Sequence, residues 1–221
     1  MSNPQKIILA VLVLGTGRGP FIDCLTNLMV MTQQAGVEVF LINIRGSDII
    51  SGRTKAVRFA LARYPTHLLW LDDDMYFPAD TALRLLERSK EVVCCNSVMK
   101  DMTARSTASM GVNEDDRVSS AGKTGLELVT GAGLGTALTE AGVYHKIEFP
   151  WFGHRWHHAA HVKTPVIGVP NWDDWLGQFE DSWFYQRCHD AGIEVWLDHD
   201  TSQRIGHWGG ITFFTEGLAA I

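Results

Sequence analysis

The sequence predicts an α/β fold in a single domain, residues 1–221, with a mainly parallel central sheet and helices on both faces. Three observations lead to this prediction. The length of 221 residues suits one domain. Hydrophobic residues make up 46% and charged residues 20%, which is typical of globular chains. In the first half, apolar runs alternate with helix-like stretches, the pattern of parallel strands joined by crossover helices.

The strands of the first half are predicted from short apolar runs, and its helices from hydrophobic residues at helical spacing. The predicted strands are residues 6–14, 37–44, 67–71 and 92–98. The predicted helices are residues 22–34, 54–63 and 80–90. Gly36 and Pro65 end the first two helices, and Asp80 is expected to cap the third.

The second half of the chain is less regular. Residues 101–130 are polar and contain glycines, which predicts a surface excursion. Residues 149–175 are dense in tryptophan and histidine, which suit stacking on a sugar or base, although burial is the commoner fate of tryptophan. A helix over residues 180–191, ended by Gly192, and a strand over residues 193–197 complete the prediction.

Composition excludes several classes of protein. The formal net charge of −6 gives no general attraction to a polyanion. The longest apolar run, residues 7–14, is too short to span a bilayer, and no small-residue cleavage site follows it, so neither a membrane span nor a signal peptide is predicted. The four cysteines lack CxxC spacing, which indicates reduced thiols. We therefore expect a cytoplasmic protein, a class that includes phage-encoded proteins acting in the host.

Three carboxylates, Asp72, Asp73 and Asp74, directly follow the apolar run of residues 67–71. Ligands of open parallel sheets bind beyond the carboxyl ends of the strands, so this acidic cluster lies where chemistry is expected. Alternate residues of an extended chain point the same way, so Asp72 and Asp74 can converge while Asp73 faces elsewhere. Neighbouring carboxylates favour a divalent cation, magnesium or manganese, of the kind shared with phosphates. The alternative is a solvated turn that caps the next helix.

The segment HLLWLDDDMYFPADTALRLLE, residues 67–87, resembles the Asp-X-Asp (DXD) segment of GT-A-fold glycosyltransferases of the family-2-like group. Three other segments resemble further parts of that family, in the same order. Residues 51–61 are similar to its arginine-containing helix start, residues 129–152 to its glycine-rich acceptor-side strand, and residues 178–210 to its Glu-Asp helix and late histidine. The resemblance implies a compact GT-A transferase that uses a metal ion and a nucleotide sugar.

The resemblance implies that a metal ion, Mn²⁺ or Mg²⁺, is bound by Asp72, Asp74 and His207. Asp74 would ligate it directly, and Asp72 would reach the ribose, or the metal through a water molecule. His207 matches the family's late histidine, a ligand that suits manganese better than magnesium. Taken alone, a histidine beside Trp208 is more simply explained as a packed side chain.

The resemblance also implies which residues hold the nucleotide-sugar donor, for which a UDP-sugar is favoured. They are Thr16, Asp48, Arg53, Asp72, Asp73, Gly131 and Gly133. Arg53 would hold a phosphate or the base near a helix N-terminus. Gly131 and Gly133 would let the backbone approach the sugar, although a glycine bulge in a strand explains them equally well.

Glu180 and Asp181 match the pair of acids from which inverting members of the family draw a catalytic base. Asp181 would take the proton of the acceptor hydroxyl, while Glu180 orients Asp181 or the acceptor. The alternative is that two acids at a helix start stabilise the helix dipole, which requires no chemistry.

The expected function is a metal-dependent glycosyltransferase that moves a sugar to an acceptor hydroxyl with inversion. The acceptor is a glycan or a hydroxymethylated DNA base. A DNA acceptor needs a basic groove, for which the candidate residues are Arg53, Arg58, Arg105, Arg155 and Lys163. Two other functions stay open, a sugar-phosphate nucleotidyltransferase and a non-catalytic nucleotide- or carbohydrate-binding module.

Overall fold

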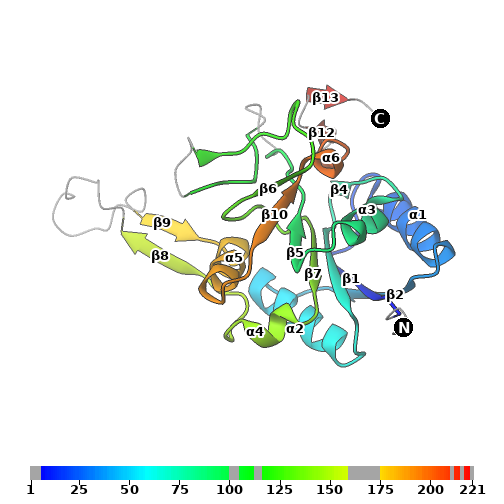
Figure 1. Cartoon of the computed structure of the whole chain (residues 1–221), viewed down its shortest axis with the longest axis horizontal. Coiled ribbons are helices and arrows are strands. Elements are labelled where there is room, and N and C mark those ends of the chain that lie inside the picture. The colour runs from blue at the N-terminus through cyan, green and yellow to red at the C-terminus, as the bar shows by residue number, and fades with distance from the viewer. Residues whose placement is uncertain are drawn as a thin grey trace.

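A seven-stranded sheet forms the centre of the protein (Figure 1). The computed structural model describes residues 6–99, 105–111, 116–158, 175–209, 212–214 and 217–219. The strand order of the central sheet is β2-β1-β3-β7-β5-β10-β6. Its strands are β1 (Ile8–Leu14), β2 (Glu38–Ile44), β3 (His67–Asp72), β5 (Val92–Cys94), β6 (Leu126–Leu128), β7 (Thr136–Glu140) and β10 (Val195–Asp198).

The strands of this sheet run mainly parallel, which confirms the predicted α/β class. β1 is parallel to β2 and to β3, and β10 is parallel to β5. β7 is the exception in the middle, because it runs antiparallel to both β3 and β5, and β6 runs antiparallel to β10 at the edge. The inserted strand β7 places Gly135 beside the end of β3, where the Asp72 amide donates to the Gly135 carbonyl at 3.0 Å.

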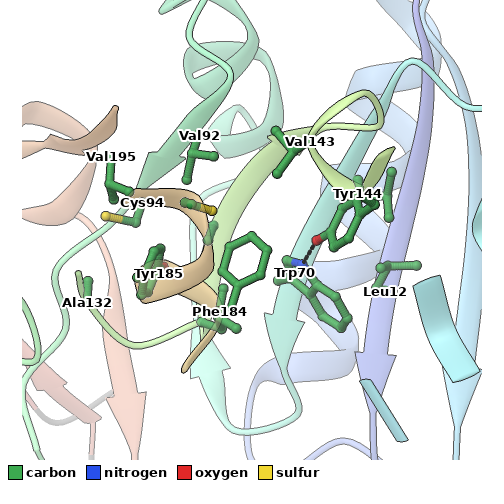
Figure 2. Packing of buried hydrophobic residues seen from close by; sticks show 14 of the residues in the cluster. Leu12, Trp70, Val92, Cys94, Ala132, Val143, Tyr144, Phe184, Tyr185 and Val195 are labelled. Atoms are coloured by element: carbon green, nitrogen blue, oxygen red, sulfur yellow. Dashed lines mark hydrogen bonds between the residues drawn. The ribbon is translucent and has the colours of Figure 1, made fainter. Parts of the chain in front are cut away.

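Helices cover both faces of the sheet, because successive residues of a strand point to opposite sides. On one face, Leu12 and Trp70 pack with residues of α2 and α5, and on the other, Val13 packs with residues of α1 and α3. Figure 2 shows the first of these clusters, in which Trp70 Nε1 donates to the Tyr144 hydroxyl at 2.9 Å. The helices are α1 (Phe21–Gln34), α2 (Ile49–Leu61), α3 (Thr81–Glu87), α4 (Val143–Lys146), α5 (Glu180–Asp190) and α6 (His199–Ser202).

A smaller, four-stranded sheet brings a late segment of the chain to the acidic strand end. Its order is β13-β12-β11-β4. β11 pairs antiparallel with β4, and His207 lies opposite Met75 in that register. Because Met75 follows Asp74 directly, the pairing carries His207 to the acidic cluster. The strands are β4 (Met75–Tyr76), β11 (Gly206–Trp208), β12 (Thr212–Phe214) and β13 (Gly217–Ala219).

The tryptophan- and histidine-rich segment is described only in part. β8 (Arg155–His158) and β9 (Trp175–Gln178) form a two-stranded antiparallel ribbon that projects from the body of the molecule (Figure 1). Residues 159–174 between these strands lie outside the described residues, as do parts of the predicted polar excursion. The proposed stacking role of this segment therefore stays a prediction.

The described part of residues 101–130 differs from the surface excursion that the sequence predicts. Ala108 and Val118 are buried in the core. Buried Asn96 anchors the segment, since its Oδ1 accepts from the Thr107 and Ala108 amides, each at 3.1 Å. Its Nδ2 donates to the Val118 carbonyl at 2.6 Å. A polar side chain inside the core thus satisfies the backbone of this segment, and the segment can pack inward.

Two helix starts also differ from the prediction. α2 begins at Ile49 and not at residue 54, because the Asp48 carboxylate caps it by accepting from the Ser51 amide at 2.9 Å. Asp80 occupies the N-cap position of α3, but its side chain makes no capping hydrogen bond. It pairs instead with Arg84 at 2.6 Å and with Arg204 at 2.9 Å. Two guanidinium groups within reach compete successfully with the helix backbone for this carboxylate.

The cysteines take no part in cross-linking. Cys24, Cys94, Cys95 and Cys188 are all buried and free. Burial raises the pKa of the Cys94 thiol to about 12, which makes it a poor nucleophile at neutral pH. Within the described residues, no helix combines the length and the apolar character needed to cross a bilayer.

Candidate active site

Three segments meet where β1 and β3 end: the glycine-rich loop of residues 15–19, the acidic cluster, and the His207-Trp208 pair. The loop depends on glycine. Gly15 has a φ of +128°, and a Cβ there would lie 2.1 Å from Asp73 Oδ2. Gly19 has a φ of +53°, and a Cβ there would lie 2.5 Å from the Trp208 ring. Glycine therefore permits both the backbone conformation and the close approach of the other two segments.

Asp73 lies in the turn after β3, where its carboxylate faces the glycine-rich loop and lies 3.5 Å from Nε of Arg18. Its carboxylate accepts from the amides of Thr16 at 3.0 Å and Gly17 at 3.3 Å. Its carbonyl accepts from the Arg18 amide at 2.7 Å. Asp73 therefore fixes the loop that carries the exposed Thr16.

Asp74 and His207 form a pair at the surface of the cluster. His207 Nε2 lies 3.4 Å from Asp74 Oδ1, and His207 Nδ1 lies 3.0 Å from the Val98 carbonyl. A carbonyl can only accept, so Nδ1 carries a proton; in the neutral ring, Nε2 then has the lone pair that a metal ion requires. The guanidinium of Arg18 lies beside this pair, 3.9 Å from Asp74 Oδ2. The sequence analysis missed Arg18, which the glycine-rich loop could have drawn attention to.

Arg53 lies beneath the cluster, with a side chain that is only 3% exposed. Its Nε donates to Glu180 Oε1 at 3.2 Å and its Nη2 donates to Asp72 Oδ1 at 3.1 Å. Its guanidinium carbon lies 5.2 Å from the centroid of the Trp70 ring. Since α2 begins at Ile49, Arg53 belongs to the second turn of that helix and not to its exposed N-terminus. The contacts are with carboxylates, whereas the resemblance implies contact with the nucleotide.

Asp181 follows Glu180 in the first turn of α5, and it is partly buried. Burial, with the neighbouring negative charge of Glu180, raises the pKa of Asp181 to about 6. Hydrogen bonding by the Ser182 amide at 2.6 Å and the positive charge of Arg53 oppose this shift. A carboxyl group with a pKa close to neutrality can accept a proton in one step and release it in the next.

Three other residues expected to hold the donor lie further from the acidic cluster or face other groups. Asp48 caps α2 and is exposed. Gly131 faces Tyr185, because a Cβ there would lie 2.8 Å from that ring, and a Cβ at Gly133 would make ordinary contacts with Thr107.

The glycine beside the acidic cluster is Gly135, which the sequence analysis did not single out. A Cβ at that position would lie 3.3 Å from Asp72 Oδ2. Its alternation with Gly131 and Gly133 along the chain is the signal that could have identified it.

The basic groove required by a DNA acceptor is only partly described. Arg53 is buried and faces the carboxylates, so it cannot line such a groove. Arg58 is exposed and lines, with Lys55 and Phe59, a hollow on the solvent-facing side of α2. Arg105 is also exposed. The Arg155 side chain and Lys163 lie outside the described part of the structure.

Comparisons with known proteins identify the fold. No protein-family model matches the chain, and no curated protein matches its sequence. Among solved structures, protein A197 from STIV has a TM-score of 0.59 at 16% identity, over 98% of this chain and 94% of that chain. A mutant of Drosophila β-1,4-galactosyltransferase 7, in complex with manganese, UDP-Gal and xylobiose, has a TM-score of 0.51 at 14% identity, over 97% of this chain and 71% of that chain.

These likenesses show that the chain has the GT-A fold, which confirms the fold implied by residues 67–87. At sequence identities of 14% and 16%, the likeness shows the fold but not the activity or the ligands. The manganese, the UDP-Gal and the xylobiose belong to the galactosyltransferase complex.

Proposed function

We propose that this chain is a metal-dependent glycosyltransferase that moves a sugar from a nucleotide sugar, with a UDP-sugar favoured, to an acceptor hydroxyl. The observation that carries the proposal is the Asp74–His207 pair at the carboxyl end of β3, with a carboxylate oxygen and an imidazole nitrogen 3.4 Å apart. The GT-A fold and the complex of a protein of this fold with manganese and UDP-Gal add support.

A divalent ion fits the residues that this pair provides. The protonated Nδ1 of His207 directs the lone pair of Nε2 toward Asp74, and a backbone carbonyl holds the ring in that orientation. Within the described residues, no group of three histidine, cysteine or acidic side chains that could hold a metal ion is found, so the expected set of Asp72, Asp74 and His207 is reduced here to the Asp74–His207 pair. Two protein ligands, with phosphate oxygens and water for the rest, suit magnesium or manganese. When bound, the ion would stabilise the negative charge of the departing diphosphate.

Asp72 takes a different role from Asp74 in this proposal. Its Oδ1 accepts from Arg53 at 3.1 Å, and its Oδ2 faces the open side of Gly135. Asp72 therefore remains available to a ribose hydroxyl or to a metal-bound water, and direct ligation is left to Asp74 and His207. Thr16 and Arg18, on the loop that Asp73 holds, are the groups proposed to contact the nucleoside and the diphosphate.

Asp181 is the proposed catalytic base. It takes the proton of the acceptor hydroxyl while that oxygen forms a bond to the anomeric carbon and the bond from this carbon to the diphosphate breaks, with its electron pair leaving on the diphosphate. Attack from the side opposite the leaving group inverts the anomeric configuration. General base catalysis of this kind contributes about 10²–10⁴ in rate.

The test is a donor screen by thermal melting, with Mn²⁺ and with UDP-, GDP- or TDP-sugars. At least one sugar nucleotide should raise the melting temperature, since a ligand at about 100 times its Kd stabilises by about 2.7 kcal/mol. Asp74→Asn and His207→Ala should each abolish the Mn²⁺-dependent part of the shift. His145→Gln is the matched control, because His145 is exposed on α4, which follows the end of β7 that lies beside His67 and away from the acidic cluster.

Two outcomes would contradict the proposal. One is the absence of any shift with every sugar nucleotide tested. The other is release of pyrophosphate from a nucleoside triphosphate and a sugar phosphate, which would make the protein a nucleotidyltransferase. A glycan and a hydroxymethylated-DNA acceptor are then distinguished by offering each with the donor that binds.

A further inference from the structure

Arg53 is a buried cation among three carboxylates. It contacts Asp72 from β3 and Glu180 from α5, and Asp181 is the next residue along α5. Its two ion pairs connect segments that lie 19 and 127 residues away in the sequence. The cation therefore connects the acidic end of β3 to the helix that carries the proposed base.

The guanidinium of Arg53 is shielded from a nucleotide, because its side chain is only 3% exposed. Nε and Nη2 already donate to carboxylates, and Nη1 is buried without a partner in the described part of the structure. The ring of Trp70 lies 5.2 Å from the guanidinium carbon. A phosphate could reach Arg53 only if neighbouring groups moved to uncover the buried Nη1, or if it displaced a carboxylate from Nε or Nη2. The second route is unfavourable because the abandoned carboxylate stays desolvated.

The contact with Arg53 joins the first turn of α5 to the acidic end of β3. The residue at its N-cap, Phe179, makes no side-chain capping hydrogen bond. Glu180 Oε1, held at 3.2 Å by Arg53, is thus a polar side-chain contact that fixes the helix start to the rest of the site. Asp181 follows it directly, and its carboxylate accepts from the Ser182 amide at 2.6 Å, so the placement of this first turn sets where that carboxylate lies.

We propose that Arg53 is a positioning residue that holds Glu180, and with it the first turn of α5, against Asp72, and that it does not bind the nucleotide. The reaction in which this positioning matters rests on the proposed function. The packing role itself rests only on the contacts of Arg53. This assignment replaces the nucleotide-binding role that the family resemblance implies for the residue.

The charges that face Asp181 give the proposal a second consequence. They are Glu180 and Tyr185 on its own helix, Arg53 from α2, and Asp72 from β3. Arg53 is the cation in this set. Its removal leaves Asp181 facing two carboxylates, which favours the protonated form of Asp181.

The first experiment separates positioning from nucleotide binding with Arg53→Lys. Lysine keeps the charge, but its ammonium cannot present the same fork to Glu180 and Asp72. We expect kcat to fall about tenfold while the Kd for UDP with Mn²⁺, measured by calorimetry, stays within about twofold. Arg63→Lys, after the end of α2 and outside the site, should change neither. A tenfold weaker UDP affinity in Arg53→Lys, or an unchanged kcat, would overturn the proposal.

The second experiment does not require turnover. The titration of the Asp181 carboxyl, followed by carbon NMR, should move upward by about one pH unit in Arg53→Met and should not move in Arg63→Met. An unmoved titration overturns the role of Arg53 even if the enzyme is active. If the wild type turns over no nucleotide sugar, the proposed function fails while this titration still decides the role of Arg53. If Arg53→Met does not fold, the Arg53→Lys measurements decide it.

Discussion

At the scale of single residues, the surroundings of Asp181 determine how activity should depend on pH. Its pKa, raised to about 6 by burial and by Glu180, lies within the range where proteins are assayed. A base must be deprotonated to act, so kcat/KM should rise with pH, level off above about pH 6, and stay high to neutrality. The measurement is a pH profile of kcat/KM with the donor identified by melting. A profile that is flat through pH 6 would contradict the assignment.

The variant Asp181→Asn sharpens this prediction, because activity and stability should move in different directions. Activity should fall by about 10²–10⁴. The wild-type carboxyl has a higher pKa folded than unfolded, so it contributes stability when protonated, at low pH, and loses that contribution as pH rises through about 6. Above that pH, the neutral amide should therefore leave the melting temperature equal or higher. Asp190→Asn, at the exposed end of the same helix, should leave both properties unchanged.

At the scale of elements, Arg88 fastens the end of α3 to the turn between β10 and α6. It forms a bidentate pair with Asp198 at 2.8 and 2.9 Å and also contacts Asp200 at 2.8 Å. The Asp198 side chain is completely buried and also caps α6 through the Thr201 amide at 3.1 Å. The buried Asp198 carboxylate thus connects the end of α3, the end of β10 and the start of α6.

Removing Arg88 should lower the free energy of unfolding, because Asp198 loses its positively charged partner. Arg88→Met leaves Asp198 buried without its cation, and breaking a buried pair in this way costs about 3–5 kcal/mol of unfolding free energy. Arg84→Met on the same helix is the control. Its pair with Asp80 is partly exposed, and Asp80 keeps Arg204, so the loss should stay below about 1 kcal/mol. Urea denaturation measures both, and equal losses in the two variants would refute the assignment.

At the scale of the whole molecule, local patterns predicted the elements better than their long-range contacts. The apolar runs and helical spacings yielded β1, β2, β3, α1 and α5 within a few residues, because those patterns depend on neighbouring residues. The position of β7 between β3 and β5 depends on pairings that no periodicity records. The family resemblance, and not the residue pattern, brought His207 into the site.

The burial of Arg53 shows the same limit at the site. A cation on a helix is exposed by default, and only carboxylates from distant parts of the chain make its burial favourable. Asp80 is a second example, because its capping role was lost to Arg84 and to Arg204, which lies far away in sequence. Local contacts were missed as well, because the Asp48 cap to Ser51, only three residues away, moves the start of α2 ahead of the predicted residue 54.

The short strand pairing between β4 and β11 predicts where a bound metal ion would change local stability. It consists of the pairs Tyr76–Gly206 and Met75–His207, extended by the Trp208 amide, which donates to the Asp74 carbonyl at 2.7 Å. A cation held by Asp74 and His207 would link the start of β4 to β11 and stabilise this pairing. The amide proton of Trp208 should then exchange with deuterium more slowly when Mn²⁺ is added. An unchanged exchange rate would count against a cation that links the two strands. Without the metal ion, the seven-stranded sheet would stay protected from exchange, and only the pairing of β11 with β4 would open more often.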